Sequence, residues 1–202
     1  MTKNIKKFAL VIAFILSAAP AMAADCSDPK NYVEGVKNDV LAVLNGNADA
    51  ATKKTKLNAI FLNVADVNFM GKFALGRTYS QLTPAQQKDY MAAYSEYLSA
   101  SYVDKFKEYN GQNITVTGVK PNGDDFSVET SIEREGKQPI IVTYRLRKAG
   151  GCFKVGDIIA EGVSLITTER QDFASVANQK GTDGLIQTLK DKTEQYKNAP
   201  AE

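Results

Sequence analysis

The stretch CFKVGDIIAEGVSLITTERQDFA, residues 152–174, decides the fold because it contains a strand, a tight turn and the start of a helix. Apolar residues recur at every second position in its first half, with one acidic residue among them: Phe153, Val155, Asp157 and Ile159. This period of two is typical of a strand with one covered face. Lys154 and Gly156 are expected to point the other way.

The second half of the stretch predicts a turn and then a helix. Glu161 and Gly162 are turn residues, and Ser164 is placed to cap a helix by accepting from an amide of its first turn. Ile166 and Phe173 lie within one helical stripe. The chain is therefore expected to leave a sheet here and to fold back against it.

Three earlier segments alternate with the same period, over about 114–116, 126–133 and 140–147. The breaks between the strands, at 121–123, 135–137 and 149–151, are short and contain glycine. Short connections of this kind are typical of hairpins, so the sheet is expected to be antiparallel.

Helical spacing of apolar residues dominates the chain before these strands. The first predicted helix runs from Pro29 to Asn45, the second covers about 48–64, and a third is capped by Asp66 and stops near Gly76. After the strands, Gly181 separates the helix that follows Ser164 from a last helix.

Residues 83–86, Thr-Pro-Ala-Gln, form a capping box with proline in the first helical position. A stripe rich in aromatic residues follows at helical spacing: Tyr90, Met91, Tyr94, Tyr97, Leu98, Tyr102 and Phe106. Such a stripe is either core packing or one wall of a ligand site, and core packing is the commoner case.

The order of elements predicts an α+β domain. We expect an antiparallel sheet of four strands, or slightly more, whose apolar face is covered by helices from both ends of the chain. Residues 24–202 are long enough for one domain with a substantial core, and residues 198–202 resemble a frayed tail.

Residues 1–23 have the pattern of a secretory signal peptide. Three lysines precede an unbroken apolar run over 8–16, and Ala21-Met22-Ala23 is a small-residue cleavage signal. Nine apolar residues are too few to cross a bilayer, which takes about 20. Without the three leader lysines, the charge of +2 becomes −1, because 22 basic residues then face 23 acidic ones.

Two cysteines, Cys26 and Cys152, are present. An exported protein meets an oxidising compartment, which favours a disulfide between them, although two small buried thiols are the alternative. Asp25 and Ala23 stand where a lipid-modified cysteine would have a small residue and a leucine, which argues against lipidation of Cys26.

The chain contains few of the residues and motifs that are typical of catalytic sites. It has no histidine, no cysteine pair with zinc spacing, no glycine-rich phosphate loop and no G-x-S-x-G turn. No basic run interleaved with aromatic residues suggests nucleic acid, and no metal or other cofactor is implied. Asp157 is the one carboxylate with a case for acid–base work, and a structural aspartate held by an arginine or backbone amides is the alternative.

A family resemblance goes further than these patterns. The segments DIIAEGVSLITTERQDF (157–173) and GTDGLI (181–186), with FMGKFALGRTYSQLTPAQQKDY (69–90), closely resemble the MlaC family. This family, also called toluene-tolerance auxiliary, is the periplasmic component of the maintenance-of-lipid-asymmetry (Mla) pathway. The likeness spans nearly the whole chain after the leader, and Cys152 departs from it where a larger residue, often tryptophan, is expected.

The resemblance implies a periplasmic phospholipid carrier. Its partners would be a phospholipid, an outer-membrane lipoprotein complex and an inner-membrane ABC transporter, and no enzymatic activity would be expected. Headgroup selectivity is expected to be weak, because no cluster of Arg and Lys marks a dedicated phosphate site.

Candidate residues for the acyl-chain cavity are the strand residues of the apolar face and helix residues opposite them: Phe69, Phe73, Leu98, Phe126, Val128, Ile140, Val142, Tyr144, Val155, Ile159 and Ile166. Each of them is alternatively ordinary core. Two other readings stay open at this point. One is an envelope enzyme that acts on a small apolar substrate with Asp157 as base, and the other is a chaperone-like module that binds protein clients.

Overall fold

The computed structural model describes residues 25–199, so the predicted signal peptide lies outside the described residues. Six helical segments come first: α1 (Pro29–Asn45), α2 (Ala50–Val64), α3 (Val67–Leu75), α4 (Arg77–Gln81), α5 (Pro84–Lys105) and the 3-10 helix η1 (Phe106–Glu108). The strands and the last helix follow: β1 (Ile114–Asn122), β2 (Asp125–Arg134), β3 (Lys137–Ala149), β4 (Cys152–Ala160), β5 (Val163–Ser164) and α6 (Leu165–Asn198).

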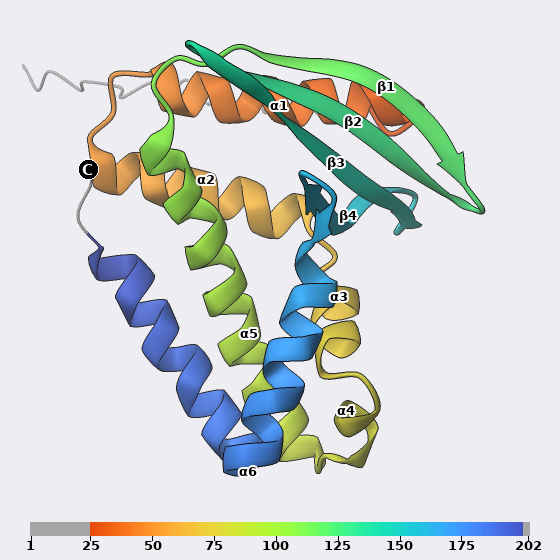
Figure 1. Ribbon diagram of the computed structural model, residues 1–202, viewed down its shortest axis with the longest axis vertical. Helices are drawn as coiled ribbons and strands as arrows, with labels where there is room; N and C mark the ends of the chain where they lie inside the picture. Colours follow the sequence, from red (N-terminus) through yellow and green to blue (C-terminus); the bar gives the residue numbers. More distant parts are fainter. Residues whose placement is uncertain (1–24, 200–202) are drawn as a thin grey trace, which may run out of the picture.

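The α+β prediction is confirmed. The strands form one antiparallel sheet in the order β1-β2-β3-β4-β5, in which the fifth strand has only two residues. Figure 1 shows the sheet as a curved layer with α1 and α2 beside it, while α3, α5 and α6 extend away as a bundle. Helices from both ends of the chain therefore pack against the sheet or against each other. Within residues 25–199, no helix is long and apolar enough to span a membrane.

The predicted helix starts are confirmed by their caps. The capping residues Asp28, Asp49, Asp66, Thr83 and Ser164 each accept a hydrogen bond from an amide in the first turn that follows. Such caps satisfy amides that have no partner within the helix. The second helix begins at residue 50 rather than near 48, because the aspartate before it is the cap.

Two glycines set the breaks in the helical part. Gly76 has a φ of +59°, and this left-handed conformation ends α3 and lets the unpredicted helix α4 begin at the next residue. Gly181 has a φ of +70° and breaks α6 into two helical stretches, as predicted. Helix α6 includes Asn198, the first residue of the predicted frayed tail, and residues 200–202 lie outside the described chain.

A β-bulge at Gly156 changes which residues of β4 face the helices. Val155 is opposite Leu146, but Asp157 is opposite Arg145, so Gly156 is an extra residue in β4. The alternation is shifted by one position after it. The prediction that Asp157 and Ile159 share a face with Val155 is therefore wrong.

The buried apolar residues form separate clusters. The larger cluster lies within the bundle of α3, α5 and α6 and includes Met70, Tyr90, Tyr94 and Leu189. A second cluster joins the start of α1 to the sheet through Tyr32, Val33, Val128, Leu146 and Phe153. The aromatic stripe of α5 thus serves mainly as core, which is the commoner of the two interpretations given to it from the sequence.

A disulfide between Cys26 and Cys152 joins the segment before α1 to the first residue of β4. Its two Cα atoms are 4.8 Å apart, and 126 positions separate the cysteines in the sequence. The Tyr32 ring lies edge-on to the Phe153 ring with 5.6 Å between their centroids. The disulfide and this ring pair therefore fix the beginning of α1 against β4.

Candidate functional site

A cavity of about 70 Å³ lies between the sheet and the helices α1 and α2, and the ends of α5 and η1 contribute to its wall. Most of its lining side chains are apolar or aromatic. They are Tyr32, Val33, Val36, Lys37, Val40, Phe61, Val64, Ala65, Tyr102, Phe106, Ile114, Thr130, Tyr144, Val155 and Ile158.

Helix α1 forms one wall because its apolar residues recur at three and four positions. Val33, Val36 and Val40 fall on one stripe and all line the cavity, together with Lys37. Val33 also packs into the sheet cluster and Val40 packs against α2 and α5 residues. Both halves of the wall are therefore held by buried contacts.

The sheet supplies the opposite wall from the face that the bulge defines. Val155 and Ile158 both line the cavity because the extra residue at Gly156 lies between them. Thr130, which is buried, donates its hydroxyl to the Val142 carbonyl at 3.1 Å. That hydrogen bond satisfies the hydroxyl, so this polar group adds little polarity to the wall.

Three tyrosines of the cavity are kept neutral by their surroundings. Burial raises the pKa of Tyr32 to about 12, and burial also raises the pKa values of Tyr102 and Tyr144. None of these phenols ionises near neutral pH. Among the described lining residues, Lys37 is the only one with a charged side chain.

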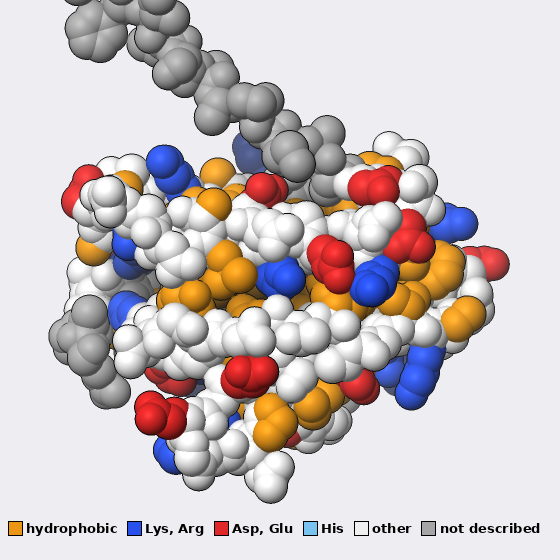
Figure 2. Space-filling model, turned by 90° about the horizontal axis from the view of Figure 1, so that it is seen from above, with side chains coloured by type: hydrophobic (Ala, Val, Ile, Leu, Met, Phe, Trp, Pro, Cys, Tyr) orange, Lys and Arg blue, Asp and Glu red, His pale blue; other side chains and the backbone are white. Residues whose placement is uncertain are grey.

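Apolar surface also reaches solvent beside the sheet. Figure 2, which views the molecule from above, shows hydrophobic side chains exposed in a groove between two ridges of polar and backbone atoms. The elements at the top of Figure 1 are α1 and the sheet, which are also the two main walls of the cavity. An amphiphile could therefore approach the cavity along an apolar groove.

The structure places the predicted cavity residues in three groups. Tyr144 and Val155 line the cavity. Phe126, Val128, Ile140 and Val142 lie on the same face of the sheet, but they do not line it. Ile159 faces the other side of the sheet because of the bulge, and Ile158 takes the predicted position.

Of the predicted helix residues, Leu98 and Ile166 are buried in the core of the α3, α5 and α6 bundle, and Phe69 and Phe73 pack against that core while partly buried. They do not line the cavity. The helices that do are mainly α1 and α2, with Tyr102 of α5 and Phe106 of η1 beside them, and the apolar stripes of these helices were visible in the sequence. What the sequence lacked was a signal for which stripe lies opposite the sheet.

Asp157, the candidate base, is buried beneath the start of α6 and outside the cavity lining. Its carboxylate accepts from the Ser164 hydroxyl at 2.8 Å and from the Ile166 amide at 3.3 Å, and Arg145 lies 3.7 Å away. These partners match the structural alternative, in which the aspartate anchors the helix to the sheet. Among the described residues, no cluster of metal-ligating side chains is present.

Glu169 is a buried carboxyl that sequence reasoning missed. It lies on α6 within the helical bundle, and the Tyr94 hydroxyl donates to its Oε2 at 2.8 Å. Its Oε1 has no hydrogen-bond partner among residues 25–199. Burial raises the pKa of Glu169 to about 7, so the group titrates near neutral pH without reaching the cavity.

Comparisons with known proteins agree on one relationship. The family model described as MlaC protein matches residues 34–191. The toluene tolerance protein ttg2D of Pseudomonas putida is 27% identical over 176 residues, which cover 84% of this chain and 82% of that protein. The intermembrane phospholipid transport system binding protein MlaC of Haemophilus influenzae is 21% identical over 204 residues, 95% of each chain.

A solved structure extends the relationship to the fold. A phospholipid-binding protein from Ralstonia solanacearum, determined in complex with a phospholipid, aligns with a TM-score of 0.74 and 25% sequence identity. The alignment covers 85% of this chain and 100% of that one. The arrangement of sheet and helices described above therefore recurs in a protein solved with a lipid.

Proposed function

This chain belongs to the MlaC protein family, and from that premise we propose that it binds the acyl chains of a phospholipid in the cavity between α1, α2 and the sheet. It carries the lipid through the periplasm between the outer membrane and an inner-membrane ABC transporter. The outer-membrane partner is a lipoprotein complex, and the exchange maintains outer-membrane lipid asymmetry. The observation that carries the proposal is the cavity itself, whose described lining is neutral except for one lysine.

The present volume of the cavity indicates that loading changes its shape. On this measure a water molecule needs about 10–15 Å³, so 70 Å³ corresponds to on the order of five water molecules. Two acyl chains with about 30 methylenes need far more room. Loading therefore requires the helical wall to move outward from the sheet, and unloading allows it to close.

Closure of the helical wall on the sheet affects the solubility of the protein as well as the volume of the cavity. An empty cavity large enough for two chains would leave a large apolar surface without contacts, which is unfavourable in water. A wall that closes when the lipid leaves removes that surface.

Organic extraction of protein purified without detergent from its native source, followed by mass spectrometry, tests the proposal. We expect diacyl phospholipid at a fixed ratio to protein. Protein that is unfolded in urea, washed and refolded provides the lipid-free control, and it should acquire lipid again from vesicles. If native protein carries no lipid and refolded protein takes up none, the carrier proposal is wrong.

The transport step needs a second assay. Transfer of labelled phospholipid between two vesicle populations, one with the outer-membrane lipoprotein complex and one with the ABC transporter, should be faster with the protein than without it. Protein that binds lipid but leaves the transfer rate unchanged would keep the binding proposal and contradict the shuttle.

A further inference from the structure

One side chain of the cavity wall does not match an apolar cargo. Lys37 lines the cavity from the same stripe of α1 as Val33 and Val40, and it is partly buried. A lysine in this setting lies with its methylene stem along the apolar wall and its ammonium group toward water. The ammonium group therefore places a positive charge at the water-facing edge of this cavity wall.

No carboxylate of the described residues neutralises that charge. Lys37 has no acidic group within 4.0 Å in the part of the chain that the structure describes. Glu34, three residues earlier on α1, lies 3.8 Å from Lys30 instead. The ammonium group is thus available to an anion from outside the protein.

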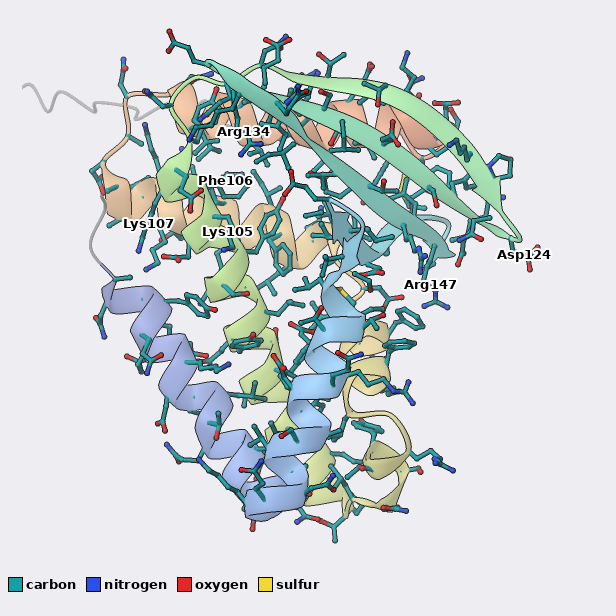
Figure 3. All side chains as sticks on the ribbon, viewed as in Figure 1. Lys105, Phe106, Lys107, Asp124, Arg134 and Arg147 are labelled. Atoms are coloured by element: carbon teal, nitrogen blue, oxygen red, sulfur yellow. A yellow bond between two sulfur atoms is a disulfide. The ribbon has the colours of Figure 1, made fainter. Side chains whose placement is uncertain are left out.

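Two other lysines near the cavity are less suited to this role. Figure 3 labels Lys105 and Lys107, the chain neighbours of Phe106, a cavity residue at the start of η1. Lys107 already contacts Asp104 at 2.5 Å and donates to the Ala199 carbonyl at 2.6 Å. Lys105 is exposed and does not line the cavity.

We propose that Lys37 binds the phosphate of the bound lipid, so that the carrier prefers phosphate-bearing lipids to uncharged diacyl lipids. The inference rests on the proposed function and adds which group of the lipid headgroup the protein binds. An apolar cavity with one cation in its wall is complementary to two acyl chains attached to one phosphate anion. The phosphate is common to all phospholipids, so this contact agrees with the expected weak selectivity among headgroups.

The test compares Lys37→Met with a matched control. Methionine keeps a long unbranched side chain and removes the charge, so packing along α1 changes little. Lys56→Met removes the same charge from an exposed position on α2 that does not line the cavity. Lys37→Arg keeps the charge and provides a rescue variant.

Each refolded, lipid-free variant is equilibrated with vesicles of phosphatidylethanolamine and phosphatidylglycerol that contain labelled diacylglycerol, and both lipids are then quantified on the protein. We expect the ratio of bound phospholipid to bound diacylglycerol to fall roughly fivefold in Lys37→Met. A change of this size corresponds to the loss of one partly exposed ion pair. Lys37→Arg and Lys56→Met should retain the preference of the original protein. Added salt should weaken the preference only in variants with a cation at position 37.

The outcomes separate this inference from the proposed function. A protein that takes up neither lipid contradicts the carrier proposal itself. Uptake of phospholipid with the same preference in Lys37→Met overturns the role of Lys37 alone. If inorganic phosphate perturbs the NMR signals of the Lys37 side chain in lipid-free protein while that preference is unchanged in Lys37→Met, the site belongs to free phosphate and the lipid assignment is wrong.

Discussion

Replacement of both Cys26 and Cys152 by serine should remove a large part of the stability of this domain. The disulfide closes a loop with a sequence separation of 126 residues. On the chain-entropy model, opening such a loop gives the unfolded chain about 16 cal/mol/K, which is about 5 kcal/mol at 25 °C. The neighbouring contacts of the fold stay in place, so this loss is attributable mainly to the unfolded state.

Urea and thermal unfolding, followed by circular dichroism, measure the loss. For a domain of this size, about 5 kcal/mol corresponds to a fall in Tm of roughly 10–20 °C. The unmodified protein in reductant should behave like the double variant, and reductant should not affect the variant. A loss below about 1 kcal/mol would refute the reasoning, because the loop constraint would then contribute almost nothing.

The same replacement should also affect the cavity. The disulfide and the Tyr32–Phe153 ring pair both fix the start of α1 against β4. Without the covalent link, that helical wall should separate from the sheet more often, so bound lipid should dissociate faster. Unchanged lipid dissociation in a destabilised variant would mean that the apolar contacts alone position α1.

Three further predictions follow from particular residues. Val36→Trp, which fills the cavity, should lower lipid content much more than Ile159→Trp, which lies on the opposite face of the sheet; equal losses measured by extraction would contradict the assigned faces. Gly156→Ala should cost about 1–3 kcal/mol in urea unfolding, because its Cβ would lie 2.6 Å from the Arg147 Cδ, and an unchanged midpoint would argue against this packing. Because the folded pKa of Glu169 is about 7 against an ordinary 4.5, the folded state holds a proton that the unfolded chain releases between these values. Stability should thus fall by up to about 3 kcal/mol as pH rises from 4.5 past 7, and Glu169→Gln should remove this dependence in urea titrations.

The sequence predicted most of the fold because its signals are local. The caps at Asp28, Asp66, Thr83 and Ser164 need only a few neighbouring residues to be recognised, and all four are confirmed. The glycine-containing breaks likewise specify hairpins without reference to the rest of the chain. Helix α4 was missed because its five residues carry no apolar stripe.

The cavity was harder to predict because it depends on distant pairings. The bulge at Gly156 leaves no mark in the alternation of β4, since Val155 and Ile159 remain two positions from Asp157. The absence of a side chain at this position depends on distant residues: Arg147 occupies the space where a Cβ of residue 156 would be, stacks on the Phe69 ring at 3.8 Å and pairs with Asp66 at 2.9 Å. Figure 3 shows Arg147 below the edge of the sheet, next to α3. Only the folded chain brings these groups together.

The energetics of the proposed cargo limit what this fold can do alone. Burial of about 30 methylenes is worth on the order of 24 kcal/mol at ~0.8 kcal/mol each. A bilayer offers the same chains nearly the same free energy, so transfer between membrane and cavity is close to isoenergetic. The cavity therefore lowers the barrier to crossing water but cannot set the direction of flow. Under the proposed function, direction would come from the membrane complexes proposed as partners, with ATP hydrolysis by the proposed ABC transporter as the source of free energy.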